Sequence, residues 1–263
     1  TLAGPKNEID YLVTHYLSKH DIHLENALAE FSSSDQFTTY NEENPFKDAL
    51  NKSHELMRLV KNPEKVKIEN ISIKSAEGFI DKIDDRLSDI EDEISKLNTQ
   101  IQALDADFNS LAPFKGLNYT LKGIYDMEFF KYRFGKIPKV NFDKFESYLD
   151  PDINAIFITT LAETEYVYGV FFAPNEYFEE VAKDFKNIDF DEIAIAKKYK
   201  DFPDKECENI LSQKEDLQKQ VQAKEDSINS VIEESKTKLV SAIRRIETAY
   251  SNFDVRKLSA VTR

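Results

Sequence analysis

The 263-residue sequence has few of the residues that build disulfide-rich, metal-rich or turn-rich proteins: one cysteine, six glycines, eight prolines and no tryptophan. The single cysteine, Cys207, excludes an internal disulfide framework and any site of several thiolates, so we expect a reducing compartment. No run approaches the ~20 apolar residues of a membrane helix. The start carries no secretory signal pattern, and the abrupt ends suggest a fragment of a longer protein.

Positive charge is also scarce, because 35 Lys and Arg face 49 Asp and Glu, a formal net charge of −14. Nucleic-acid binding needs clustered cations that displace counterions, so no nucleic-acid partner is expected. Aromatic residues still make up 12% of the chain, too many for a disordered acidic tail. We therefore interpret the aromatic run Phe129, Phe130, Tyr132 and Phe134 as core plus a partner-facing surface, not as a base-stacking platform.

Catalytic motifs are missing from the sequence. It has no GxxxxGK[ST] or GxGxxG loop to cradle phosphates and no GxSxG nucleophile turn. His20 and His23, with Glu25 or Glu30 nearby, could be cast as metal ligands, but on a strand the two rings would point to opposite faces. We therefore expect no catalytic site, no metal and no cofactor.

Paired carboxylates between residues 84 and 93 could be cast as general acids and bases. Such chemistry needs burial or a close like charge, whereas this segment reads as the solvated face of a helix. The residues concerned are Asp84, Asp85, Glu91, Asp92 and Glu93. Gly123, Gly135 and Gly169 are interpreted as turn or strand-packing residues.

Apolar periodicity is the strongest signal in the sequence. Between residues 80 and 111, apolar side chains recur at alternating steps of three and four, a heptad pattern typical of a coiled-coil seam. The positions are Ile80, Ile83, Leu87, Ile90, Ile94, Leu97, Ile101, Leu104, Phe108 and Leu111. A helix with one apolar stripe needs a partner that covers the stripe.

A second helical stretch, residues 206–256, supplies that partner. Its apolar steps are four and seven as far as Ile243, so that several pairs lie eleven apart, which predicts an irregularly supercoiled pair. Asp204 is the predicted N-cap of this helix. The apolar positions are Leu217, Val221, Ile228, Ile232, Leu239, Ile243, Ile246, Tyr250 and Phe253. Together the two stretches predict a long antiparallel two-helix coiled-coil hairpin.

The residues between the two stretches read as a small α/β lobe. Strand patterns at 128–134, 153–160, 166–173 and 190–195 alternate with helices after Pro138 and Pro174, giving the βαββαβ order of a split βαβ, ferredoxin-like fold. Upstream, strands at 1–4 and 22–25, a helix at 6–18 and a helix at 46–60 predict a partial α/β lobe.

The sequence therefore predicts an α+β chain shaped as an elongated dumbbell. An incomplete base lobe spans residues 1–72, the first coiled-coil arm 73–112, a ferredoxin-like tip lobe 113–205, and the returning arm 206–263. Residues 46–60 are expected to pack against the overhang of the second arm.

Residues 132–147 read YRFGKIPKVNFDKFES. This stretch resembles the tip lobe of subunit I, also called subunit a, of rotary V/A-type ATPases, in which an RFG-x-IP strand end precedes such a helix. The matching positions are Arg133, Phe134, Gly135, Ile137 and Pro138. The order of the following strands and helices, and the arm, lobe and arm arrangement, are similar to the cytoplasmic N-terminal region of that family.

The resemblance implies a non-catalytic stator at the cytoplasmic face of a membrane. Its lobes would hold peripheral stalks, the helical E/G heterodimers, and resist rotor torque during ATP-coupled proton or sodium transport. The membrane domain of the parent chain would follow, and central-stalk or rotor-associated subunits are further partners. We expect the tip-lobe surface to bind the stalks, without assigning individual residues. No ion-path residue is carried over.

Two alternatives remain open at this point. A ferredoxin-like lobe could serve a ligand-sensing regulatory module, which would shift its melting temperature when a metabolite binds. A coiled-coil arm of a nucleotide-hydrolysing enzyme would need a phosphate loop, which the sequence lacks.

Overall fold

The computed structural model describes residues 4–5, 8–17, 27, 37–39, 42–147 and 154–262. The chain separates into two compact units: residues 1–93 with 224–263 form the first, and residues 94–223 form the second. Two long helices, α4 (Ile73–Leu111) and α8 (Pro203–Asp254), contribute to both units. Each unit is described by itself.

The long helices begin and end where local chemistry requires it. α4 is 39 residues long and gives way to a 3₁₀ turn, η4 (Ala112–Phe114), that contains Pro113. α8 is 52 residues long and starts at Pro203, whose missing N–H would have had no helical partner anyway. The predicted cap at Asp204 is wrong: Asp204 lies in the first turn, where its carboxylate accepts a hydrogen bond of 2.8 Å from the Gly116 N–H.

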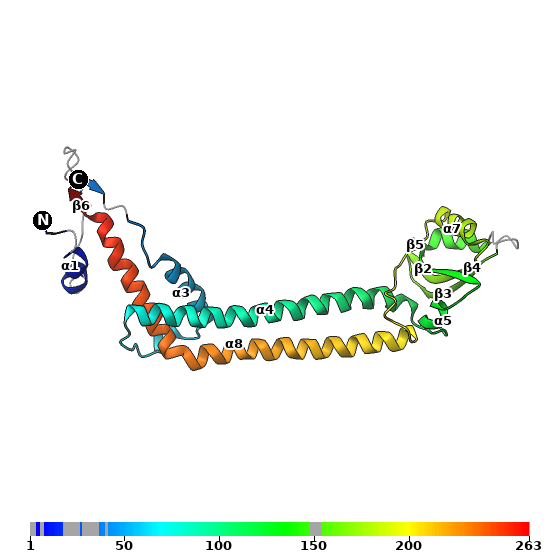
Figure 1. The fold of residues 1–263 in the computed structure, drawn as a ribbon. Helices are drawn as coiled ribbons and strands as arrows, with labels where there is room; N and C mark the ends of the chain where they lie inside the picture. Colours follow the sequence, from blue (N-terminus) through cyan, green and yellow to red (C-terminus); the bar gives the residue numbers. More distant parts are fainter. Residues whose placement is uncertain are drawn as a thin grey trace. The chain divides into compact units, whose positions relative to one another are not determined.

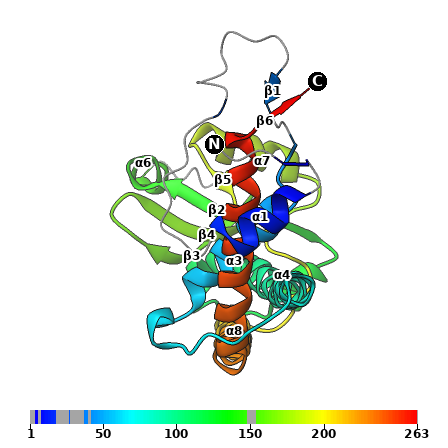
Figure 2. The ribbon, with the colours of Figure 1, turned by 90° about the vertical axis from the view of Figure 1, so that its left-hand side faces the viewer.

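The first unit also holds α1 (Ile9–His15), α3 (Lys47–Leu59), the 3₁₀ turns η3 (Pro63–Lys65) and η5 (Val255–Leu258), and a two-stranded sheet. In that sheet β1 (Phe37–Thr39) runs antiparallel to β6 (Ala260–Thr262), as Figure 2 shows. Of the strand predicted at 1–4, only Gly4 is described, and it is not in a strand. The strand predicted at 22–25 lies outside the described residues.

The core of the first unit forms where α3 packs against α4 and α8. Leu56 of α3 is 3% exposed and belongs to the same cluster as Ile243 of α8, so the predicted packing of residues 46–60 is confirmed. The buried members are Leu56, Val60, Ala76, Ile80, Ile83, Leu87, Val231, Ile232, Leu239, Val240, Ala242, Ile243 and Ile246.

Polar side chains tie the segments of this unit together around its core. The Asn44 side-chain amide donates to the Tyr250 carbonyl and to Asp254 Oδ1, both at 3.0 Å. The Lys52 ammonium on α3 lies 2.8 Å from Asp81 and 3.2 Å from Asp84, both on α4. These contacts fix where α3 lies on the long helices.

The second unit contains a four-stranded antiparallel sheet of β2 (Phe130–Pro138), β3 (Ile156–Ala162), β4 (Tyr166–Pro174) and β5 (Asp191–Glu192). The strand order is β3-β4-β2-β5. Helix α6 (Lys139–Ser147) connects β2 to β3, and α7 (Phe178–Asn187) connects β4 to β5. This is the order of a split βαβ unit, as predicted, although the last strand is only two residues long.

Helices cover both faces of this sheet. On one face, Phe171 of β4 packs against Phe178 and Phe185 of α7. On the other, Phe134 and Val170 pack against η4, α5 (Leu121–Tyr125) and the adjoining ends of α4 and α8. In Figure 1, α5 and α7 lie on opposite sides of the strands. Sequence periodicity missed this second cover because α5, at five residues, is too short to show a helical repeat.

Candidate partner-binding surface

The RFG-x-IP motif lies inside β2. Phe134 and Ile137 are 4% and 0% exposed and belong to the clusters on the two opposite faces of the sheet. The Arg133 Nε is 3.0 Å from Glu192 Oε2 of β5, and its guanidinium lies 4.9 Å from the ring centre of Phe178. Pro138 is the last residue of β2, directly before the first residue of α6. The motif residues therefore have a structural role: Phe134 and Ile137 belong to the cores on the two faces of the sheet, and Arg133 links β2 to β5 and α7.

Gly135 of the motif faces Gly169 directly across β2 and β4. A Cβ atom on Gly135 would lie 2.3 Å from the Phe190 ring and 2.4 Å from the Asp191 carbonyl oxygen. A Cβ atom on Gly169 would lie 2.4 Å from the Ile158 carbonyl oxygen and 2.5 Å from the Phe157 ring. The two glycines thus leave room for two aromatic rings against the backbone of the sheet.

The predicted seam positions differ in burial along the two helices. Those in the core of the first unit are buried, and those farther along α4 and α8 are half-buried. The buried ones are Ile83, Leu87, Ile232 and Leu239; the half-buried ones are Ile90, Ile94, Leu97, Ile101, Leu104, Leu217, Val221 and Ile228.

Two lysines take inward positions of α8 that the apolar pattern left out: Lys224 lies in the gap between Val221 and Ile228, and Lys214 lies three residues before Leu217. Lys214 and Lys224 extend their half-buried side chains toward α4, where they pair with Asp105 and Glu93. With them, the inward positions from Cys207 to Ile228 follow steps of three and four, so the eleven-residue spacing was incomplete. Long lysine stems can cover apolar surface while the ammonium stays near water.

Of the five carboxylates between residues 84 and 93, Asp84 is half-buried and the other four are exposed, and two of the five form ion pairs that the sequence did not predict. Asp84 pairs with Lys52 of α3 at 3.2 Å, and Glu93 pairs with Lys224 of α8. Both ion pairs join neighbouring helices within the first unit, so these two carboxylates have a structural role.

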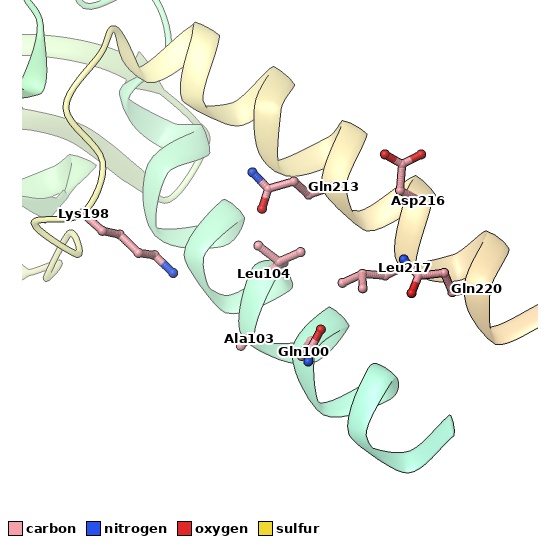
Figure 3. Close-up of a pocket in the computed structure, with 8 residues that line it drawn as sticks. All are labelled: Gln100, Ala103, Leu104, Lys198, Gln213, Asp216, Leu217 and Gln220. Carbon is pink, nitrogen blue, oxygen red and sulfur yellow. The ribbon is translucent and has the colours of Figure 1, made fainter. Parts of the chain in front are cut away.

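A groove of about 430 Å³ lies between α4 and α8 in the second unit (Figure 3). Its one cation, Lys198, is bound through Nζ to Asp107 Oδ2 at 2.6 Å, and the Tyr199 hydroxyl donates to the same oxygen at 2.7 Å. The lining residues are Gln100, Ala103, Leu104, Lys198, Gln213, Asp216, Leu217 and Gln220. Amides and aliphatic groups dominate this lining, which offers weak binding contacts and no nucleophile paired with a base.

The contacts of the Asp107 carboxylate with Lys198 and Tyr199 make the stability of the second unit depend on pH. Burial acts to raise the pKa of Asp107, but the hydrogen bonds from Lys198 and Tyr199 outweigh it, and the pKa lies below its ordinary value. A carboxyl whose pKa is lowered by folding stabilises the native state above its unfolded pKa, and this contribution is lost as pH falls through the folded pKa.

We expect Asp107→Asn to lower the free energy of unfolding by about 1–3 kcal/mol at pH 7, because two hydrogen bonds lose their charged acceptor. The difference from wild type should be constant between about pH 5 and 7 and shrink below about pH 4. Urea unfolding monitored by tyrosine near-UV circular dichroism measures it. Asp126→Asn, at an exposed position, is the matched control. If the difference in free energy of unfolding between wild type and Asp107→Asn does not change with pH, the stabilising role of the Asp107 carboxylate is contradicted.

Within the described ranges, no three or more His, Cys, Asp and Glu side chains come together as a metal site. The candidate ligands His20, His23, Glu25 and Glu30 lie outside those ranges. Cys207 is fully buried in the core of the second unit, and burial raises the pKa of its thiol. No described helix has both the length and the apolar character of a membrane span.

Large apolar side chains are exposed at the end of the sheet where β2 begins and β4 ends. Met127, Phe129, Phe130 and Tyr177 are 37%, 76%, 42% and 42% exposed. We call these four residues the aromatic corner. The sequence pointed to a partner-facing surface on this lobe, but single residues could not be assigned. The available signal was the density of aromatic residues in 129–134, where four of six positions are aromatic.

Asn175 ties the two segments of the aromatic corner together. Its N–H donates to the Phe129 carbonyl at 3.1 Å, and its side-chain amide donates to the Glu128 carbonyl at 2.8 Å. Phe130 is the strand partner of Pro174, whose carbonyl accepts a hydrogen bond of 3.0 Å from the Tyr177 N–H. The backbone that carries the exposed rings is therefore fixed before any partner binds.

Comparisons with known proteins gave one informative result. No protein-family model matches the chain, and no curated protein matches it in sequence. Among solved structures, it is similar to the crystal structure of the cytoplasmic N-terminal domain of subunit I, homolog of subunit a, of V-ATPase. The similarity has a TM-score of 0.51 and covers 97% of this chain and 87% of that chain, at 11% sequence identity. The two proteins share a fold.

Proposed function

We propose that this chain is the cytoplasmic N-terminal region of a subunit I, or subunit a, of a rotary V/A-type ATPase. In this role it is a non-catalytic stator part that anchors peripheral stalks to the membrane ion-translocating part. The observation that carries the proposal is the fold shared with such a domain over 97% of the chain. The RFG-x-IP sequence of β2 supports it independently.

The proposed work is mechanical. A stator holds the stationary parts against rotor torque, which needs stiff elements and binding surfaces more than reactive groups. Helices of 39 and 52 residues joined to compact cores suit that task. We propose that α4 and α8 form a coiled-coil strut between a base lobe and a tip lobe, giving an elongated dumbbell along the cytoplasmic face of the membrane.

Small-angle X-ray scattering tests the proposed shape. A compact globule of 263 residues has a radius of gyration of about 18 Å, and a dumbbell should exceed this clearly and show a rod-like distance distribution. A value near 18 Å for the monomer would reject the strut.

The proposed partners are the E/G heterodimers, the membrane domain of the parent chain and central-stalk or rotor-associated subunits. Purified chain and an E/G heterodimer from the same source should form a stoichiometric complex on size exclusion and in analytical ultracentrifugation. An acidic protein of similar size and charge is the control for unspecific attraction. Absence of a complex at about 10 µM of each protein, where micromolar affinity would be visible, would overturn the stator proposal.

A further inference from the structure

We infer that the aromatic corner is the docking site for a cationic amphipathic helix of a partner protein. The natural identity of that partner rests on the proposed stator function, whereas the chemistry of the site rests on the residues described here. The site combines exposed apolar side chains, a backbone held by hydrogen bonds and a mainly acidic rim.

The apolar part of the site is unusually exposed. Phe129 has the highest exposed fraction, 76%, among the large apolar side chains that the structure describes. Met127 and Phe130 lie next to Phe129 along the chain, and the Asn175 and Pro174 backbone contacts bring the segment that carries Tyr177 beside them. Large apolar side chains exposed close together are typical of interaction sites, and aromatic anchors on a fixed backbone lose little entropy when they bind.

Acidic side chains surround the aromatic corner. Asp126 and Glu128 flank Met127 on one segment, and Glu176, Glu179 and Glu180 flank Tyr177 on the other, all of them exposed. Residues 123–130 and 174–182 contain no lysine or arginine. The next cation along β2, Lys131, lies over the Phe178 ring at 5.3 Å from its centre. A partner that covers the rings must therefore bring positive charge to the rim.

The charge of the rim selects among possible occupants. An anionic membrane surface and a second copy of this chain, with its net charge of −14, would both be repelled. An added β-strand is disfavoured at this end because the Glu128 and Phe129 carbonyls already accept hydrogen bonds from Asn175. A helix needs no backbone pairing and presents apolar anchors at steps of three and four between flanking cations, which fits the site.

A synthetic peptide tests the inference on the full chain. The probe is a fluorescent helix of about 18 residues with a leucine stripe between lysines, and its matched partner carries glutamate in place of lysine. Fluorescence anisotropy should show binding of the lysine helix only. The double variant Phe129→Ala, Phe130→Ala should weaken binding about tenfold or more, and the double variant Glu128→Lys, Glu176→Lys should shift preference to the glutamate helix.

Control variants that make the same kinds of substitution elsewhere in the unit separate binding at this site from general attraction to an acidic chain. Leu211→Ala, Glu208→Lys and Glu215→Lys alter exposed residues of α8 in the same unit and should leave lysine-helix binding unchanged. Equal weakening by the control variants would overturn the inference. So would binding to anionic phosphatidylserine vesicles that depends on Phe129 and Phe130.

The same variants distinguish the two proposals. If an E/G heterodimer binds the wild type and both double variants of the aromatic corner equally, the docking inference fails and the stator proposal stands. If the lysine helix binds at the aromatic corner while no E/G heterodimer binds the chain, the docking inference stands and the stator proposal fails. Circular dichroism of each variant verifies that it is folded.

Discussion

Replacing Phe171 with alanine is expected to lower the free energy of unfolding of residues 94–223 by about 3–5 kcal/mol. Phe171 is 1% exposed, and its ring centre lies 4.2 Å from that of Phe185, 5.2 Å from that of Phe190 and 5.8 Å from that of Phe178. Truncation removes the ring shared by these contacts and leaves a cavity that the rigid sheet cannot close. Urea unfolding followed by tyrosine near-UV circular dichroism provides the measurement.

Phe129→Ala is the matched control for this experiment. It removes the same side chain from the same unit, but from a position that is 76% exposed, so the expected loss is below about 0.5 kcal/mol. Equal losses for the two variants would contradict the core assigned to Phe171. A loss confined to Phe171→Ala also shows that the aromatic corner can be changed without harming the fold.

The second large effect is expected for Gly169→Ala. The added methyl group would lie 2.4 Å from the Ile158 carbonyl oxygen, a backbone atom that cannot move without disturbing the pairing of β3 with β4. Overpacking of this kind costs about 1–3 kcal/mol. Thermal unfolding should show a lower midpoint, and hydrogen exchange should be faster in peptides of β3 and β4.

Gly78→Ala provides a control of opposite sign. Gly78 lies within α4, and nothing approaches a Cβ built there within 4 Å. Alanine is favoured over glycine in a helix by about 1 kcal/mol, so this variant should be slightly more stable than wild type. Destabilisation by Gly78→Ala would mean that this face of α4 is covered by something other than solvent.

Long repeats and strand order could be predicted from the sequence because they leave periodic signals. The steps of three and four from Ile80 to Leu111 predicted a helix that the structure shows as Ile73–Leu111. The alternation of strand and helix patterns predicted the βαββαβ element order of a ferredoxin-like fold, and the structure has a four-stranded sheet of order β3-β4-β2-β5. Each of these patterns lies within a short stretch of sequence, so it can be recognised without knowing which distant residues come into contact.

Features that depend on distant contacts could not be predicted. Lys214 and Lys224 look like solvent-facing charges until Asp105 and Glu93 are seen opposite them. The five-residue helix α5 carries no repeat, and its place on the sheet is decided by the cluster that buries Leu121 and Ile124. The aromatic corner likewise depends on Asn175, which joins two segments that lie 45 or more residues apart in the sequence.

The division of the chain has a consequence for synthesis. Residues 94–223 form one uninterrupted segment, whereas the other unit needs residues 1–93 together with residues 224–263. The ribosome therefore completes residues 94–223 before the other unit, and this unit can fold while residues 1–93 still lack their later partners. β1 pairs with β6 across more than 200 residues, so this contact forms only after residues 260–262 have emerged. Until residues 231–246 of α8 have been made, Leu56 and Ile80 lack the partners that bury them, so residues 42–93 keep an apolar surface exposed during synthesis.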